Sequence, residues 1–238
     1  MKNANETKPS VILVHGAFAD ASCWQKVILL LEKRGLPVTA VQLPLKSLAD
    51  DIATAKRMIE AQKGEVILVG HSYGGAVTSG AATGSEKVKA LVYTAAFAPD
   101  EGESPAGLLQ KFPPTALATA LVPDSAGFLY IDRTKFRDAF AHDVTTEEAS
   151  VMAATQKPLA ANAFGESAPA PAWKEIPSWY AVSTQDNSIP PDLERFFAKR
   201  MGATTRELKA SHVAIISQPA EIVKLIEAAV ETVVPVPA

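Results

Sequence analysis

The stretch VILVGHSYGGAV, Val66 to Val77, decides the fold and raises the question of function. An apolar run ends at Gly70, a glycine-rich turn follows, and small residues suited to a helix come next. Glycines on both sides of Ser72 allow the backbone to bend sharply. The pattern predicts a strand, a tight turn and a helix, with Ser72 at the apex of the turn.

Strand-like and helical stretches alternate on both sides of this turn. Short apolar runs are typical of buried strands, whereas apolar residues at helical spacing indicate amphipathic helices. The alternation predicts βαβ units, and hence an α/β fold with a doubly wound, mostly parallel sheet. The expected strands are 10–15, 36–44, 65–70, 88–97, 178–183 and 203–209, and the expected helices are 22–35, 47–64, 74–83, 191–202 and 218–233.

The rhythm is interrupted between residues 100 and 176. This segment is rich in Ala, Pro and Ser, with helical patches at 133–144 and 145–156 and no strong strand. We interpret it as a helical insertion in a single domain whose core is formed by residues 1–99 and 177–238.

Composition narrows the class of protein. The 238 residues include 47% hydrophobic ones, and 23 basic against 26 acidic residues give a net charge of −3. There is no basic stripe for nucleic acid and no apolar stretch long enough to span a membrane. A single cysteine, Cys23, excludes an internal disulfide, and no zinc motif is present. The first ten residues lack the apolar core of a signal peptide, so we expect a soluble, cytoplasmic protein.

Ser72 stands in the pattern Gly-x-Ser-x-Gly between an expected strand and an expected helix, the context of a nucleophile elbow. The free N–H groups at the helix amino end favour developing negative charge. An ordinary glycine-rich turn, or one that binds phosphate, is the alternative interpretation.

A serine hydroxyl needs a base, and the chain has four histidines. His212 follows the last expected strand, so it belongs to the same sheet edge as Ser72. His71 should point away from its neighbour, His15 should organise a loop, and His142 should be a solvated surface residue. We therefore predict His212 as the base.

The histidine in turn needs a carboxylate to fix its tautomer. Asp186 follows the strand at 178–183 and is the favoured candidate; Asp100, after the preceding strand, is the rival. The order Ser72, Asp186, His212 is the chain order of α/β-hydrolases.

An oxyanion hole is expected from the stretch HGAF, His15 to Phe18, which follows the first strand. Gly16 permits a close backbone approach, so that the N–H of Ala17 can act together with that of Tyr73, the residue after the nucleophile. Another glycine turn without this role is the alternative.

Four stretches, VILVHGAFADASCW, VGHSYGGAV, YTAAFAPDEGES and STQDNSIPP with SHVAIISQP, resemble the α/β-hydrolase superfamily. More narrowly, the chain resembles small bacterial hydrolases related to plant methyl-ester esterases and hydroxynitrile lyases. The resemblance implies the same catalytic residues, no metal and no organic cofactor. It also implies that segment 100–176 is a cap over the site. Substrate contacts are expected from Phe18, Phe97, Phe128 and Val213, although aromatic residues at such spacing also serve packing.

Two departures from the hydroxynitrile lyases bear on the reaction. Those enzymes carry a lysine after the catalytic histidine, where this chain has Val213, and a threonine where it has Gly16. We therefore predict hydrolysis of a small carboxylic ester or lactone. A lyase, or a non-catalytic receptor for a small molecule, is the alternative on the same fold. The expected partner is an ester substrate, with neither nucleic acid nor membrane, and a homodimer stays open.

Overall fold

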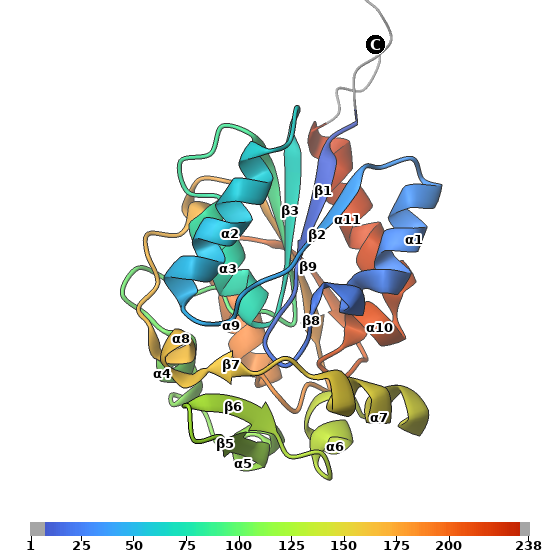
Figure 1. Ribbon diagram of the computed structural model, residues 1–238. Coiled ribbons are helices and arrows are strands. Elements are labelled where there is room, and N and C mark those ends of the chain that lie inside the picture. Colours follow the sequence, from blue (N-terminus) through green and yellow to red (C-terminus); the bar gives the residue numbers. More distant parts are fainter. Residues whose placement is uncertain (1–7, 234–238) are drawn as a thin grey trace, which may run out of the picture.

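A single six-stranded sheet forms the centre of the molecule (Figure 1). The computed structural model describes residues 8–233. The strand order is β2-β1-β3-β4-β8-β9, and every neighbouring pair is parallel. This confirms the predicted α/β class with a parallel sheet. The strands are β1 (Ser10–Val14), β2 (Val38–Val41), β3 (Val66–His71), β4 (Val88–Thr94), β8 (Ser178–Ser183) and β9 (Thr204–Leu208).

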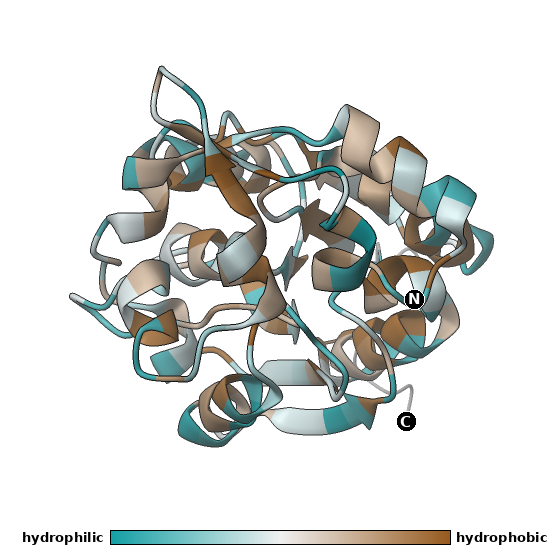
Figure 2. Cartoon of the chain, turned by 90° about the horizontal axis from the view of Figure 1, so that it is seen from below, coloured by the Kyte–Doolittle hydropathy of each residue, from teal (hydrophilic) through white to brown (hydrophobic). Residues whose placement is uncertain are grey.

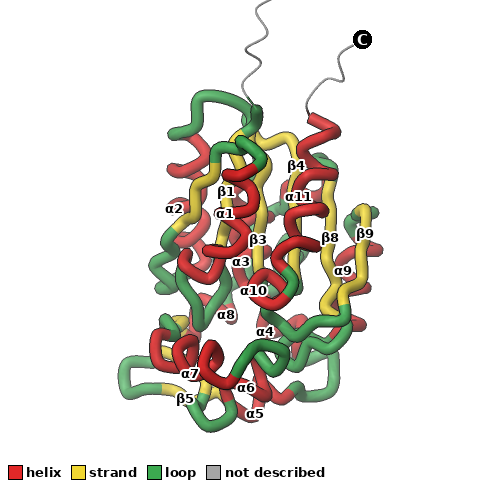
Figure 3. Tube along the Cα trace, turned by 90° about the vertical axis from the view of Figure 1, so that its right-hand side faces the viewer, coloured by secondary structure: helices red, strands yellow, loops and turns green. Residues whose placement is uncertain are grey.

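Helices cover both faces of this sheet (Figures 1 and 3). Alternate residues of β1 explain why: Val11 and Leu13 belong to one buried cluster, and Ile12 and Val14 belong to the other. One face carries η1 (Ala21–Trp24), α1 (Gln25–Lys33), α10 (Ala214–Ser217) and α11 (Pro219–Val233), and the other carries α2 (Leu48–Glu60), α3 (Tyr73–Ala81) and α9 (Pro191–Arg200).

The segment between β4 and β8 crosses the end of the sheet at which the strands finish, and we call residues 100–176 the cap (Figure 1). Its helical elements are α4 (Pro105–Leu109), α5 (Ala116–Ala120), α6 (Phe136–Phe140), α7 (Thr146–Thr155), α8 (Ala161–Gly165) and η2 (Ala172–Lys174). Seen from the cap side, hydrophilic and hydrophobic residues are mixed along these elements (Figure 2).

The cap is not purely helical, as the predicted helical insertion would be. It contains a small antiparallel sheet of β5 (Leu121–Pro123), β6 (Phe128–Ile131) and β7 (Leu159–Ala160). Each strand has two to four residues, and most residues of β5 and β6 are partly or fully exposed. Such strands leave neither a long apolar run nor a clear alternation in the sequence.

Strand register brings two glycine turns together at the carboxyl edge. Val14 pairs with Gly70, so the residues that follow β1 and β3 leave the sheet side by side. Chain order reverses between these two strands, which makes this the switch point at which α/β proteins bind ligands.

Candidate active site

Ser72 occupies a strained turn between β3 and α3. Its φ of 55° and ψ of −127° are unusual for a residue with a side chain. Gly74 makes the turn possible, because a Cβ there would lie 2.5 Å from the carbonyl oxygens of Val14 and His15. The turn therefore holds the serine above the sheet edge at a cost in backbone strain.

Ser72, His212 and Asp186 form one continuous hydrogen-bonded chain. Ser72 Oγ lies 2.8 Å from His212 Nε2, and His212 Nδ1 lies 2.5 Å from Asp186 Oδ2. A neutral imidazole with its proton on Nδ1 satisfies both bonds: it donates to the carboxylate and accepts from the hydroxyl. His212 is 1% exposed and Asp186 5%, so both bonds are shielded from water.

The second oxygen of Asp186 is fixed by the backbone. Its Oδ1 accepts hydrogen bonds from the N–H groups of Ser188, at 2.5 Å, and Ile189, at 3.0 Å. The rival Asp100 instead forms an ion pair with Lys174, which lowers the pKa of its carboxyl. The structure thus brings Asp186, and not Asp100, to His212.

The other three histidines have different surroundings. His15 organises its loop, since its Nε2 accepts from the Leu43 N–H at 3.0 Å and its Nδ1 donates to the Gly16 carbonyl at 2.7 Å. Burial lowers the pKa of His15 to about 4, so it is neutral. His142 lies at the surface of the cap, where it is half-buried and bonds the Gln185 carbonyl at 2.8 Å.

His71 is buried next to His212, the expected base. Its Nε2 donates to the backbone carbonyl of His212 at 2.9 Å, and the two rings are 4.8 Å apart. Burial, with His212 adding to it, lowers the pKa of His71 well below its ordinary value. A neutral His71 can therefore support the His212 backbone without placing a positive charge beside the base.

The two expected oxyanion donors belong to turns that meet at Ser72. Gly16 packs directly against Ser72: a Cβ on Gly16 would be 2.6 Å from Ser72 Cβ and 3.2 Å from Ser72 Oγ. Ala17 follows it, and Tyr73 begins α3, where the helix amino end favours negative charge. Among the turn, loop and cap hydrogen bonds of residues 8–233, neither the Ala17 amide nor the Tyr73 amide donates to a backbone carbonyl. The Tyr73 side chain faces elsewhere, donating from its hydroxyl to Asp51 at 2.8 Å.

Two acidic residues that support the site were missed by the sequence analysis. Asp143, in the cap, accepts from the Ser211 N–H at 2.8 Å and also bonds the Ser211 and Ser217 hydroxyls, so it holds both ends of the His212 loop. Glu194 is fully buried on α9 and accepts from the Ser183 N–H at 3.0 Å, at the end of the strand that leads to Asp186. Neither residue belongs to a local motif, because each contact joins distant parts of the chain.

Of the four residues expected to contact substrate, only Phe18 lines a cavity near the site. Phe18 lines an apolar cavity of about 180 Å³ under the cap. Phe97 is 2% exposed and packs edge-on against Phe164, another residue of that cavity. Phe128 is half-buried on β6, beside the cavity residue Leu129, and does not line the cavity. Val213 is buried directly after His212 and keeps its surroundings apolar.

Within residues 8–233, no three His, Cys, Asp or Glu side chains are grouped so that they could hold a metal ion. Cys23 is half-buried, and burial raises the pKa of its thiol. No helix within residues 8–233 is both long and apolar enough to cross a bilayer.

A parallel α/β sheet with a nucleophile elbow at its switch point, a capping insertion and an aligned Ser-His-Asp chain defines the α/β-hydrolase class of enzymes. The model of the "Alpha/beta hydrolase family" matches residues 11–225. The chain belongs to this family.

Individual relatives agree with this assignment. Norfluorocurarine synthase 2 of Strychnos sp is 27% identical, over 98% of this chain and 100% of the relative. Methylesterase 1 of Arabidopsis thaliana is 37% identical, over 44% of this chain and 46% of the relative. The relatives also include an alpha-hydroxynitrile lyase of Arabidopsis thaliana, so the narrower resemblance seen in the sequence is confirmed.

A solved structure supports the fold. A pyrethroid hydrolase from Sphingobium faniae JZ-2 superposes with a TM-score of 0.80 at 24% identity, covering 94% of this chain and 97% of the other. At 24% identity this match shows the fold alone.

Proposed function

We propose that the protein is a serine esterase that hydrolyses small carboxylic esters or lactones through an acyl-enzyme. The observation that carries this proposal is the hydrogen-bonded chain from Ser72 Oγ through His212 to Asp186, with distances of 2.8 and 2.5 Å. Methylesterases among the relatives support an ester as the substrate.

The first half of the reaction acylates the serine. Ser72 Oγ attacks the carbonyl carbon while His212 Nε2 takes the hydroxyl proton, and Asp186 stabilises the resulting imidazolium. The carbonyl oxygen becomes an oxyanion, which accepts hydrogen bonds from the Ala17 and Tyr73 amides. His212 then gives its proton to the leaving alkoxide, so that the alcohol departs and the acyl group remains on Ser72.

The second half repeats these steps with water. His212 takes a proton from a water molecule, the hydroxide attacks the acyl-enzyme, and the proton returns to Ser72 Oγ as the acid leaves. Residues of the chain supply every proton transfer in this scheme. The cytoplasmic location and the homodimer stay predictions.

The competing lyase reaction is disfavoured by the neighbour of the base. Cleavage of a cyanohydrin releases cyanide, which a nearby ammonium group would stabilise by Coulomb attraction in a dry site. Val213 has no charge and is 1% exposed, so it cannot act in this way. Ester hydrolysis needs no such cation, because its negative charge develops at the oxyanion.

The two reactions can be measured on one preparation at one pH. We expect turnover of p-nitrophenyl acetate and no useful cleavage of mandelonitrile, and Ser72→Ala should abolish the esterase activity. Mandelonitrile cleavage as fast as ester hydrolysis would overturn the esterase proposal in favour of the lyase.

A further inference from the structure

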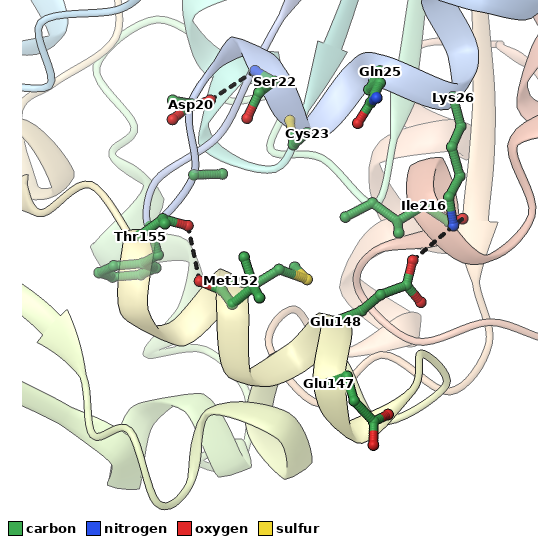
Figure 4. A pocket seen from close by; sticks show the side chains of 13 residues that line it. Asp20, Ser22, Cys23, Gln25, Lys26, Glu147, Glu148, Met152, Thr155 and Ile216 are labelled. Atoms are coloured by element: carbon green, nitrogen blue, oxygen red, sulfur yellow. Dashed lines mark hydrogen bonds and ion pairs between the residues drawn. The ribbon is translucent and has the colours of Figure 1, made fainter.

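Two separate spaces meet at Phe18, the residue after the expected oxyanion donor Ala17, and neither of them is lined by Ser72 or His212. The inner cavity, of about 180 Å³, is lined by Phe18 and by cap residues that are almost all apolar, among them Ala106, Leu129 and Phe164. The outer groove, of about 390 Å³, lies between the segment Asp20–Lys26 and α7 (Figure 4). Its apolar residues include Val151, Met152 and Ile216, and its rim carries polar and charged side chains.

Phe18 is the one residue that lines both spaces within the described part of the chain. It follows Ala17, has a positive φ of 59° and is 7% exposed. Its ring packs edge-on against Phe140 at 6.3 Å, and the Phe140 ring lies 4.8 Å from that of His212. The boundary between the two spaces is therefore close to the reacting groups.

An ester bound at Ser72 has two arms that diverge from its carbonyl carbon. The leaving oxygen belongs to the alcohol arm and must receive its proton from His212. The outer groove is lined by Ile216, on the short helix α10 that follows His212. The rest of the groove is formed by the segment 18–26 and by the cap helix α7, and the inner cavity is formed by Phe18 and other cap residues. Of the two spaces, the outer groove is the one that includes a residue, Ile216, from the segment directly after His212.

We propose that the outer groove binds the alcohol part of the ester and that the inner cavity binds the acyl part. This assignment rests on the proposed esterase function. An engineered cavity of about 150 Å³ accommodates benzene, so the inner cavity has room for an acyl group of about one ring. The outer groove has room for a larger alcohol, with an apolar body against Val151 and Ile216 and a hydrogen-bonding end at the polar rim.

Isomeric esters test the assignment because they exchange the two arms. Methyl phenylacetate carries its ring on the acyl side, and benzyl acetate carries it on the alcohol side. Ala106→Phe fills the inner cavity, and Ala118→Phe, at an exposed position that lines the same cavity, is a second variant if the first folds poorly. Val151→Trp fills the outer groove from a residue that is 62% exposed.

We expect the inner-cavity variants to lower kcat/KM for methyl phenylacetate by about tenfold or more while changing that for benzyl acetate about twofold or less. Val151→Trp should do the reverse. Val122→Trp is the matched control, since Val122 is 46% exposed and lines neither space. It should leave both esters unaffected.

The opposite pattern would overturn the assignment, and so would equal effects on both esters. Failure of the esterase proposal gives a different result. In that case the wild-type protein hydrolyses neither ester, or Ser72→Ala hydrolyses them as fast as the wild type. Hydrolysis that depends on Ser72 but shows the reversed pattern would overturn the assignment alone.

Discussion

The parallel-sheet core and the cap are built in different ways. All six residues of β3 in the core are buried, whereas only Ile131 is buried among the four residues of β6 in the cap. Of the core residues proposed for catalysis, Ser72 and Asp186 follow the fully buried strands β3 and β8, and His212 follows the edge strand β9. The cap consists of short elements that enclose the inner cavity. We infer that the core determines the reaction and the cap determines which ester fits.

The largest effect on activity is expected from replacing Asp186, the residue of the core that we propose as the catalytic acid. Asp186→Asn should lower kcat by about 10⁴-fold for every ester, because His212 loses the partner that fixes its tautomer. Asp100→Asn is the matched control and should retain most of the activity, since Asp100 bonds Lys174 instead. Steady-state kinetics on two esters checks this. A greater loss in Asp100→Asn would move the acid to the end of β4.

Gly16→Ala tests the close approach of two core turns. The new Cβ would lie 2.6 Å from Ser72 Cβ, so either the nucleophile or the neighbouring Ala17 amide must move. Loss of one oxyanion donor costs about 10²- to 10³-fold in kcat, and we expect a loss of that size. Gly165→Ala in the cap is the control, because its Cβ would meet no atom within 4 Å. Full activity in Gly16→Ala would contradict the proposed position of the oxyanion hole.

A buried histidine of the core, His15, should make the free energy of unfolding depend on pH. The folded pKa of His15, about 4, lies below its ordinary value of 6.5. Between these values the unfolded chain binds the additional proton, so the contribution is present above pH 6.5 and lost as pH falls toward 4. It amounts to at most about 3 kcal/mol.

Urea unfolding of the wild type and of His15→Gln at several pH values between 4 and 6.5 gives the free energy of unfolding of each protein. The contribution of His15 is the difference between the two proteins in how steeply this free energy falls with pH. Asp51 acts in the opposite direction, because burial raises its pKa to about 6, and Asp51→Asn should therefore steepen the loss of stability on acidification. If the free energy of unfolding depends on pH in the same way for the wild type and for His15→Gln, His15 is not held neutral in the folded protein.

The smallest effect is expected at an ion pair that joins core and cap. Lys26 on α1 and Glu148 on α7 are 2.9 Å apart, with side chains 48% and 42% exposed. Exposed pairs contribute about 0.2–1 kcal/mol, and salt screens them. Glu148→Gln should change the free energy of unfolding by no more than this, and less at 1 M salt. A loss well above 1 kcal/mol would mean that the cap depends on this pair rather than on apolar packing.

The same contrast explains what could be predicted from the sequence. Buried parallel strands are continuous apolar runs, so β1, β3, β4 and β8 could be located, and the residues after them share one sheet edge. Ser72, Asp186 and His212 could therefore be selected together from residue types and position. The structure brings these three side chains into hydrogen-bonding contact.

The supporting contacts and the cap could not be predicted in this way. Asp143 and Ser211 are 68 residues apart, and no local pattern records their hydrogen bond. Glu194 lies on a helix whose sequence shows ordinary acidic residues near its start. The strands of the cap are too short and too exposed to produce a period, so their antiparallel sheet was missed.

Labelling with a fluorophosphonate tests the central claim most directly, because only an activated serine reacts quickly with it. The product is followed by intact-protein mass spectrometry, and the modified residue is located by peptide mapping. We predict one equivalent of label on Ser72 in the wild type, much slower labelling in His212→Gln and none in Ser72→Ala. Rapid labelling of Ser72→Ala, or a label on any other residue of the wild type, would contradict the account.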